Sequence, residues 1–186
     1  MFEDIRRAFP NIPEEAVRLW ILPLAQKEGW PPTRQHQWDV RVTGRLFSFW
    51  NAAEWEKMDV NLSEIPYSRG FVDSMLGLRE AYLLGVENDY WRLLGEDGRR
   101  RFNECYIYIL KNQHFPQPPI LSLNDTGKYD VVDGNHRFLG FITAKSAYKA
   151  YEEMNVAQQQ EFLNSLNVEN LSSPNSTQEV WICKPR

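Results

Sequence analysis

The chain of 186 residues is 42% hydrophobic and 13% aromatic, so it can bury a substantial core in one domain with an extension. Its formal charge of −4 disfavours a protein that grips duplex DNA nonspecifically, because such proteins usually carry a basic face. The two cysteines, Cys105 and Cys183, lie far apart in apolar runs and match neither a zinc site nor a disulfide framework. Without a secretory pattern or a long apolar stretch, we expect a cytoplasmic protein with no membrane partner.

Residues 1–30 are predicted to be helical. Asn11 is a good helix cap and Pro13 suits the first turn that follows it. Pro23 lacks a backbone N–H, so we expect it to kink or divide the helix. The run Gly-Trp-Pro-Pro at 29–32 should end it. Seven tryptophans, most of them before residue 92, favour an aromatic core in this region.

The next stretch is harder to interpret. Residues 38–42 alternate like a strand, and residues 46–57 are expected to form a helix that presents Phe47, Trp50 and Trp55. Residues 58–65 have apolar side chains at every second position and are predicted to form a strand. His36 lies in a polar context with no second ligand near it, and we assign it no role.

The middle of the chain is predicted to be mainly helical. Residues 71–84 carry an apolar stripe at helical spacing, and residues 88–94 favour a further helical turn. Two glycines within residues 95–98 indicate a turn. Residues 101–111 are apolar and suit either a helix or a strand, and their position favours a helix packed under a sheet.

A β-hairpin is predicted next. The prolines of residues 116–119 force an extended entry, and Ile120–Leu123 is typical of a strand. Residues 124–128 form a loop that contains glycine, and residues 129–132 should return antiparallel. The remaining predicted elements are helices over 137–154 and 157–166 and a closing strand over 179–183.

The most informative motif is Asp133-Gly134-Asn135-His136-Arg137, where the hairpin strand runs into a helix. A helix start has unpaired backbone N–H groups and a partial positive charge, so it can hold an anion. Gly134 allows close approach of the backbone, Arg137 offers a planar fork of donors, and His136 can donate or shuttle a proton. The motif therefore predicts a phosphate-binding turn.

A simpler interpretation uses the same residues. Asp-Gly is a common turn pair, and Asp133 could cap the following helix. His136 could then be a half-buried structural histidine and Arg137 a surface cation. The spacing alone favours this simpler interpretation, because short motifs often occur by chance.

With its flanks, the motif resembles the ParB/sulfiredoxin superfamily. The resemblance is carried by residues 118–120, the apolar hairpin, and residues 133–137 opening a helix. The resemblance also includes residues 60–65, which match the first strand of that fold, and the polar segment 66–69 that follows this strand. The closing strand at 180–182 fits the fold as well. It implies an α+β fold with a small mixed sheet flanked by helices. The implied division is an α-rich N-terminal extension over 1–57 and the ParB/sulfiredoxin-like domain over 58–186.

The resemblance also implies a nucleotide site, because members of this fold hold nucleotide phosphates at the corresponding turn. Its branches hydrolyse CTP while clamping DNA, use ATP to repair an over-oxidised cysteine, or phosphorylate free serine. The implied ligand is ATP, ADP or CTP, with or without Mg²⁺, and no protein metal site is implied. The implied phosphate-binding residues are Asp133, Gly134, Asn135, His136, Arg137, Ser68 and Arg69; the implied catalytic residues are His136, Arg137 and Glu64, the last as a candidate base.

Two departures from the pattern of the superfamily narrow the set of expected activities. Sulfiredoxins carry a reactive cysteine just before the histidine of this turn, where this chain has Asn135, which argues against sulfiredoxin activity. ParB proteins add a downstream DNA-binding module, for which residues 141–186 are too few. We expect a phosphotransferase or NTP hydrolase first. The alternatives are a ParB-like DNA-binding or nuclease protein that uses Arg99–Arg101, and a non-enzymatic interaction module that uses the Trp-rich first 57 residues.

Overall fold

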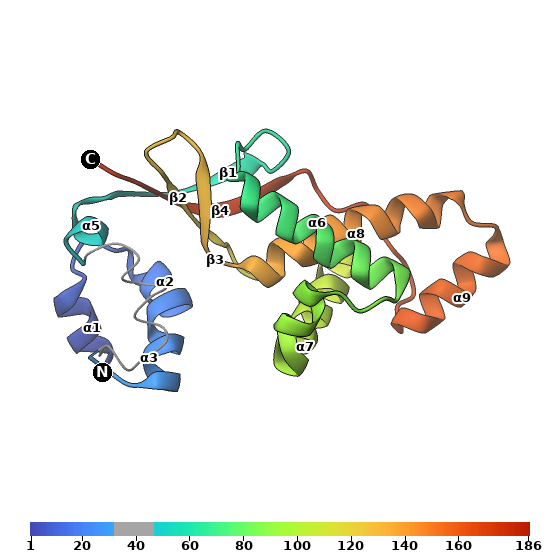
Figure 1. Cartoon of the computed structure of the whole chain (residues 1–186), viewed down its shortest axis with the longest axis horizontal. Coiled ribbons are helices and arrows are strands. Elements are labelled where there is room, and N and C mark those ends of the chain that lie inside the picture. The colour runs from blue at the N-terminus through green and yellow to red at the C-terminus, as the bar shows by residue number, and fades with distance from the viewer. Residues whose placement is uncertain (32–46) are drawn as a thin grey trace. The chain divides into compact units, whose positions relative to one another are not determined.

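The computed structural model describes residues 1–31 and 47–186, and the expected α+β class is confirmed (Figure 1). The helical elements are α1 (Phe2–Ala8), α2 (Glu14–Ala16), the π-helical η1 (Val17–Ile21), α3 (Leu22–Glu28), α5 (Phe47–Ala52), α6 (Arg69–Leu84), α7 (Asp89–Asn112), α8 (Asn135–Glu153) and α9 (Val156–Leu166). The strands are β1 (Glu54–Asn61), β2 (Ile120–Leu123), β3 (Tyr129–Asp133) and β4 (Thr177–Lys184).

The strands form one mixed sheet in the order β1-β4-β2-β3. β2 pairs antiparallel with β3, which confirms the predicted hairpin, and it pairs parallel with β4. The hairpin loop is shaped by Asn124, whose side-chain oxygen accepts hydrogen bonds from the backbone N–H groups of Thr126 and Lys128 at 3.0 and 3.1 Å. Such bonds explain why asparagine favours turns.

The described chain packs as two compact units, each assembled from separate segments. Unit 1 comprises Met1–Met58, Pro119–Asp133 and Val180–Arg186, and unit 2 comprises Asp59–Pro118 and Gly134–Glu179. The division into an extension over 1–57 and a domain over 58–186 stays a prediction.

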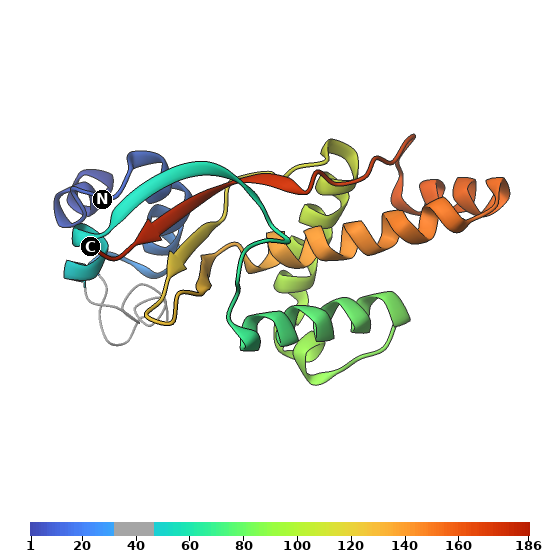
Figure 2. The ribbon, with the colours of Figure 1, turned by 90° about the horizontal axis from the view of Figure 1, so that it is seen from above.

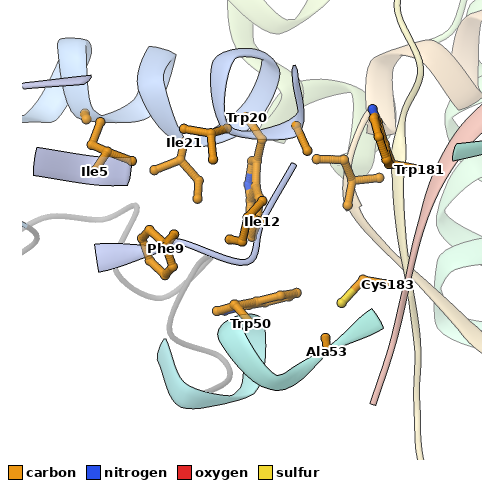
Figure 3. Close-up of a cluster of buried hydrophobic side chains, with 13 residues drawn as sticks. Ile5, Phe9, Ile12, Trp20, Ile21, Trp50, Ala53, Trp181 and Cys183 are labelled. Carbon is orange, nitrogen blue, oxygen red and sulfur yellow. The ribbon is translucent and has the colours of Figure 1, made fainter. Parts of the chain in front are cut away.

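Unit 1 is built around an aromatic core, as the tryptophan content favoured. Trp20 and Trp50 are both buried and meet edge to face, with ring centroids 5.0 Å apart. Trp181 and Cys183, on one side of β4, are buried in the same cluster (Figure 3). Edge-to-face pairing adds about 0.5–1.5 kcal/mol to the burial of such rings. The first helices are therefore held to strand residues by shared apolar packing.

The predicted helices within residues 1–30 are confirmed, but the N-cap of α2 is Pro13 rather than Asn11. The π-helical η1 lies immediately before α3, and Pro23 lies in the first turn of α3. The backbone stays helical at both junctions of η1, so a π-helical turn precedes the proline and the expected division does not occur. Gly29 ends α3 with a φ of 102°, which a residue with a side chain rarely adopts. The predicted strand over 38–42 and His36 lie outside the described residues.

The predicted helix over 46–57 is wrong in its second half. α5 ends at Ala52 and β1 begins at Glu54, so Trp55 lies on a strand. Charges on β1 are matched by the other end of the chain: Glu56 pairs with Lys184, and Glu54 with Arg186, each at 3.3 Å. Oppositely charged pairs across strands favour a strand here over the helix that the aromatic spacing indicated.

Unit 2 is dominated by the crossing of α7 and α8, which Figure 2 shows in yellow-green and orange. At the crossing lies Gly140, where an added Cβ would be 3.1 Å from the backbone nitrogen of Tyr106 and 3.3 Å from the carbonyl carbon of Cys105. The absence of a side chain at Gly140 therefore lets the two helix backbones approach closely.

The predicted turn over 95–98 is wrong except at its first residue. Only Gly95, with φ 66° and ψ 177°, leaves helical geometry, and α7 continues on both sides of this kink. Glycine lowers helix propensity but does not forbid a helix that is packed on a neighbour. Residues 101–111 are therefore helical, which resolves the helix-or-strand ambiguity.

We predict that Gly140→Ala destabilises the protein by about 1 kcal/mol, because an overpacking cost of about 1–3 kcal/mol exceeds the helix propensity that alanine gains. Gly70→Ala is the matched control: Gly70 is also helical, and nothing lies within 4 Å of its added Cβ. Urea unfolding should show Gly70→Ala neutral or slightly stabilising. Equal effects of the two changes would contradict the close-crossing argument.

Candidate functional site

The candidate site is the start of α8. Gly134 is the N-cap residue, in a left-handed conformation with φ 113° and ψ 17°, and no side chain caps the helix. The first helical bond is made by the N–H of Phe138 to the carbonyl of Gly134 at 3.0 Å. The amides of Asn135, His136 and Arg137 therefore have no acceptor within the helix. Such a helix end attracts anions.

Asp133 does not occupy the cap position that the simpler interpretation gave it. It is the last residue of β3, paired with Ile120 of β2, and the cap residue is Gly134. Asp133 also ends unit 1, whereas Gly134 and the remaining site residues belong to unit 2. The geometry below therefore concerns unit 2 alone.

Arg137 has a defined structural position. It is half-buried, and its Nη1 donates hydrogen bonds to the carbonyl oxygens of Gln117 and Pro118 at 3.2 and 3.1 Å. These carbonyls belong to the proline-rich segment that precedes β2, which bends at Pro116 and Gln117 instead of running straight as predicted. Arg137 is thus more than a solvated surface cation, since it fastens this segment to the first turn of α8.

His136 is half-buried and faces α7. Its Nε2 lies 3.4 Å from the position that a Cβ on Gly98 would take, an ordinary van der Waals distance, so the ring packs against α7 beside Gly98. This packing agrees with the structural interpretation of His136, and a role in proton transfer stays a prediction. The sequence placed Gly98 in a predicted turn. It contains no local signal that Gly98 lies next to His136.

The three upstream candidates lie at the exit of β1 and the start of α6. Ser68 is the N-cap of α6 without a side-chain cap bond. Arg69 has a 91% exposed side chain, and it pairs with Asp73 at 3.6 Å. Glu64 is exposed, and its Oε1 accepts a hydrogen bond from Nδ2 of Asn61 at 2.7 Å. Their roles in phosphate binding and catalysis stay predictions.

An aromatic cluster brings the start of α6 to the start of α8. The ring of Phe138 lies 5.5 Å from that of Tyr67 and 5.6 Å from that of Phe71, in both cases edge to face. Tyr67 directly precedes Ser68, and Phe138 directly follows Arg137. The cluster therefore anchors the segment that carries Ser68 and Arg69 to the first turn of α8. Sequence analysis missed this cluster, although the aromatic neighbours of both motifs were a signal.

The basic run Arg99–Arg101 is engaged in ion pairs along and near α7. Arg99 pairs with Glu87 at 2.9 Å, and Arg100 and Arg101 both pair with Asp97 at 2.7 and 3.0 Å. Arg100 also pairs with Glu104 at 2.8 Å. Because these carboxylates neutralise the run, it offers little of the basic surface that DNA binding requires.

The two cysteines behave as packed residues. Cys183 is buried in the core of unit 1, and Cys105 is half-buried on α7. Burial raises the pKa of the Cys105 thiol, although the positive charge of Arg137 acts in the opposite direction. A raised pKa disfavours the reactive thiolate, so the environment of Cys105 does not activate it as a nucleophile.

No family model matches the chain, and no curated protein and no solved structure matches it. The resemblance to the ParB/sulfiredoxin superfamily therefore stays a prediction. Within the described ranges 1–31 and 47–186, no three His, Cys, Asp or Glu side chains cluster as metal ligands. In those same ranges, every helix is too short or too polar to cross a bilayer.

We predict that Arg137→Ala destabilises the protein by about 1–3 kcal/mol, because the hydrogen bonds from a charged group to the two carbonyls are lost. Arg69→Ala removes the same charge from the first turn of α6 and breaks only an exposed ion pair, so its effect should stay within about 0.5 kcal/mol. Urea unfolding of both variants measures the contrast. A neutral Arg137→Ala would show that the arginine is not a structural anchor.

Proposed function

We propose that this protein binds a nucleotide through its phosphate groups at the first turn of α8. The observation that supports this most directly is the uncapped start of a 19-residue helix behind a left-handed glycine. The N–H groups of residues 135–137 and the helix dipole there favour a dianionic ligand. Gly134 is buried, so an anion would approach this turn from the side of the exposed Asn135, where the missing Cβ of Gly134 leaves the backbone uncrowded.

The side chains of the same turn suit this ligand. Arg137 is held in place by Gln117 and Pro118, and an ordered guanidinium loses little further entropy when it binds an oxyanion. Asn135 is exposed beside it and can donate through its amide. The aromatic cluster keeps Ser68 and Arg69 near this turn, which supports their place on the opposite wall.

We propose phosphoryl transfer or nucleotide hydrolysis as the chemistry, on a ParB/sulfiredoxin-like fold. Such reactions need positioning and charge neutralisation, which Arg137 and His136 supply. Glu64, held by Asn61, is the candidate base. The nucleotide is ATP, ADP or CTP, with Mg²⁺ arriving on its phosphates.

The other candidate functions receive less support. The ion-paired state of Arg99–Arg101 weighs against a DNA-binding role. Trp20 and Trp50 are buried in the core of unit 1, which weighs against a docking surface made of the N-terminal tryptophans. Neither alternative has an observation of its own that favours it.

The test uses Asn135→Asp, which places a carboxylate at the first turn of α8. A negative charge there favours the helix dipole, so stability should rise by about 0.3–1 kcal/mol, while repulsion weakens phosphate binding. Asn155→Asp is the matched control, because Asn155 caps α9 and its side-chain oxygen accepts the N–H of Gln158 at 3.0 Å. Calorimetry with ATP, ADP, CTP and GTP, with and without Mg²⁺, measures binding.

We expect wild type and Asn155→Asp to bind one nucleotide with similar affinity, and Asn135→Asp to bind it at least tenfold more weakly. A ligand that binds only the folded state should also raise the melting temperature. Absence of binding by the wild type at millimolar nucleotide would remove the proposal. Undiminished binding by Asn135→Asp would place the nucleotide elsewhere on the protein.

A further inference from the structure

A second site lies in unit 2, in a cavity between α6 and α8. Its volume is about 210 Å³, and its walls are mainly apolar. Val72 and Leu76 remain 37% and 40% exposed, so the cavity opens to solvent beside apolar side chains. Six side chains form most of the wall: Val72, Met75 and Leu76 from α6, and Phe138, Phe141 and Ile142 from α8.

One polar group on the wall is the hydroxyl of Tyr67. It is buried, and it makes no hydrogen bond to any residue in the described part of the chain. Burial raises the pKa of Tyr67, so the hydroxyl stays protonated and can donate. An unsatisfied buried hydroxyl costs about 1–3 kcal/mol. Its oxygen has almost no solvent-accessible surface, so neighbouring side chains must shift before a ligand can accept its hydrogen bond and recover that cost.

A second polar group is the ammonium of Lys145. Its Nζ lies 5.5 Å from the centroid of the Phe141 ring and 3.5 Å from Oγ of Ser176, a long hydrogen bond. It forms no ion pair with any carboxylate of residues 1–31 or 47–186. A cation without a counter-charge beside an apolar cavity complements a ligand that has an apolar body and one anionic end.

We propose that this cavity binds a small carboxylate amphiphile, such as a short acyl chain. The chain packs against the walls from α6 and α8, and the carboxylate accepts a hydrogen bond from Lys145 and, once the neighbouring wall side chains shift, one from Tyr67. The cavity is small compared with the roughly 300–1,000 Å³ of many ligand sites, which favours a short chain over a long one. The proposal is independent of nucleotide binding, since it uses neither the helix start nor Arg137.

The experiment titrates octanoate and, as its uncharged analogue, octanol into the full chain by calorimetry. Lys145→Gln should weaken octanoate binding about tenfold, the equivalent of one hydrogen bond to a charged group, and leave octanol binding unchanged. Lys149→Gln is the matched control: it removes the same charge one turn further along α8, from an exposed side chain that does not line the cavity. It should affect neither ligand.

Two further variants separate the cavity from unspecific binding. Leu76→Trp fills the cavity and should abolish binding of both ligands, with Val72→Phe as the substitute if the first variant does not fold. Tyr67→Phe removes the unsatisfied hydroxyl, so it should keep or raise the melting temperature while it weakens octanoate binding. A structural role alone would lower stability.

Three results would each overturn the proposal. The first is a wild type that does not bind octanoate with one-to-one stoichiometry at millimolar concentration. The second is a folded Leu76→Trp variant that still binds octanoate. The third is an equal change in octanoate affinity for Lys145→Gln and Lys149→Gln. Asn135→Asp should bind octanoate like the wild type, so failure of this site and failure of the nucleotide site are distinguishable.

Discussion

The close approach of α7 and α8 at Gly140 is the contact on which the rest of unit 2 depends. A Cβ on Gly140 would lie 3.1 Å from the backbone nitrogen of Tyr106 and 3.3 Å from two atoms of Cys105, so a side chain there would force α7 to shift by a few tenths of an ångström. The contact packs α8 closely on α7, and the His136 ring lies against the same helix beside Gly98. The first turn of α8 is held in addition by the hydrogen bonds of Arg137 and by the aromatic contacts of Phe138.

The two faces of α8 then have different uses. One face packs on α7 and supplies rigidity, whereas the other, with Phe138, Phe141 and Lys145, borders α6 across the apolar cavity. The polar first turn of α8, which begins at Asn135, lies at the N-terminal end of both faces. α8 buries its own residues Phe138, Leu139, Phe141 and Ala144. Because this tertiary packing supplies most of the stability of the helix, the missing side-chain cap costs it little. That reserve of stability lets α8 begin without a side-chain cap.

Sequence reasoning succeeded where local signals agree. The strands around residues 120–132 and the loop at Asn124 were predictable, because β-rich residues and turn chemistry point the same way. It failed at Trp55, whose aromatic spacing suited a helix while its charged neighbours pair with Lys184 and Arg186 from the far end of the chain. The break predicted at 95–98 is present at Gly95 alone, because the helix resumes at Glu96 and includes Gly98. The fastening of Arg137 to Gln117 and Pro118, the position of His136 against Gly98 and the meeting of Tyr67 with Lys145 at one cavity all depend on tertiary contacts that no local pattern contains.

The order β1-β4-β2-β3 has a consequence for biosynthesis. β4, which lies between β1 and β2, is the last of the four strands to leave the ribosome, and it carries Trp181 and Cys183 of the unit 1 core. Until it emerges, β1 lacks its neighbour in the sheet and β2 keeps one open edge, and such edges readily pair with other chains. The nascent protein therefore passes through an interval in which the edges of β1 and β2 are open to pairing with other chains.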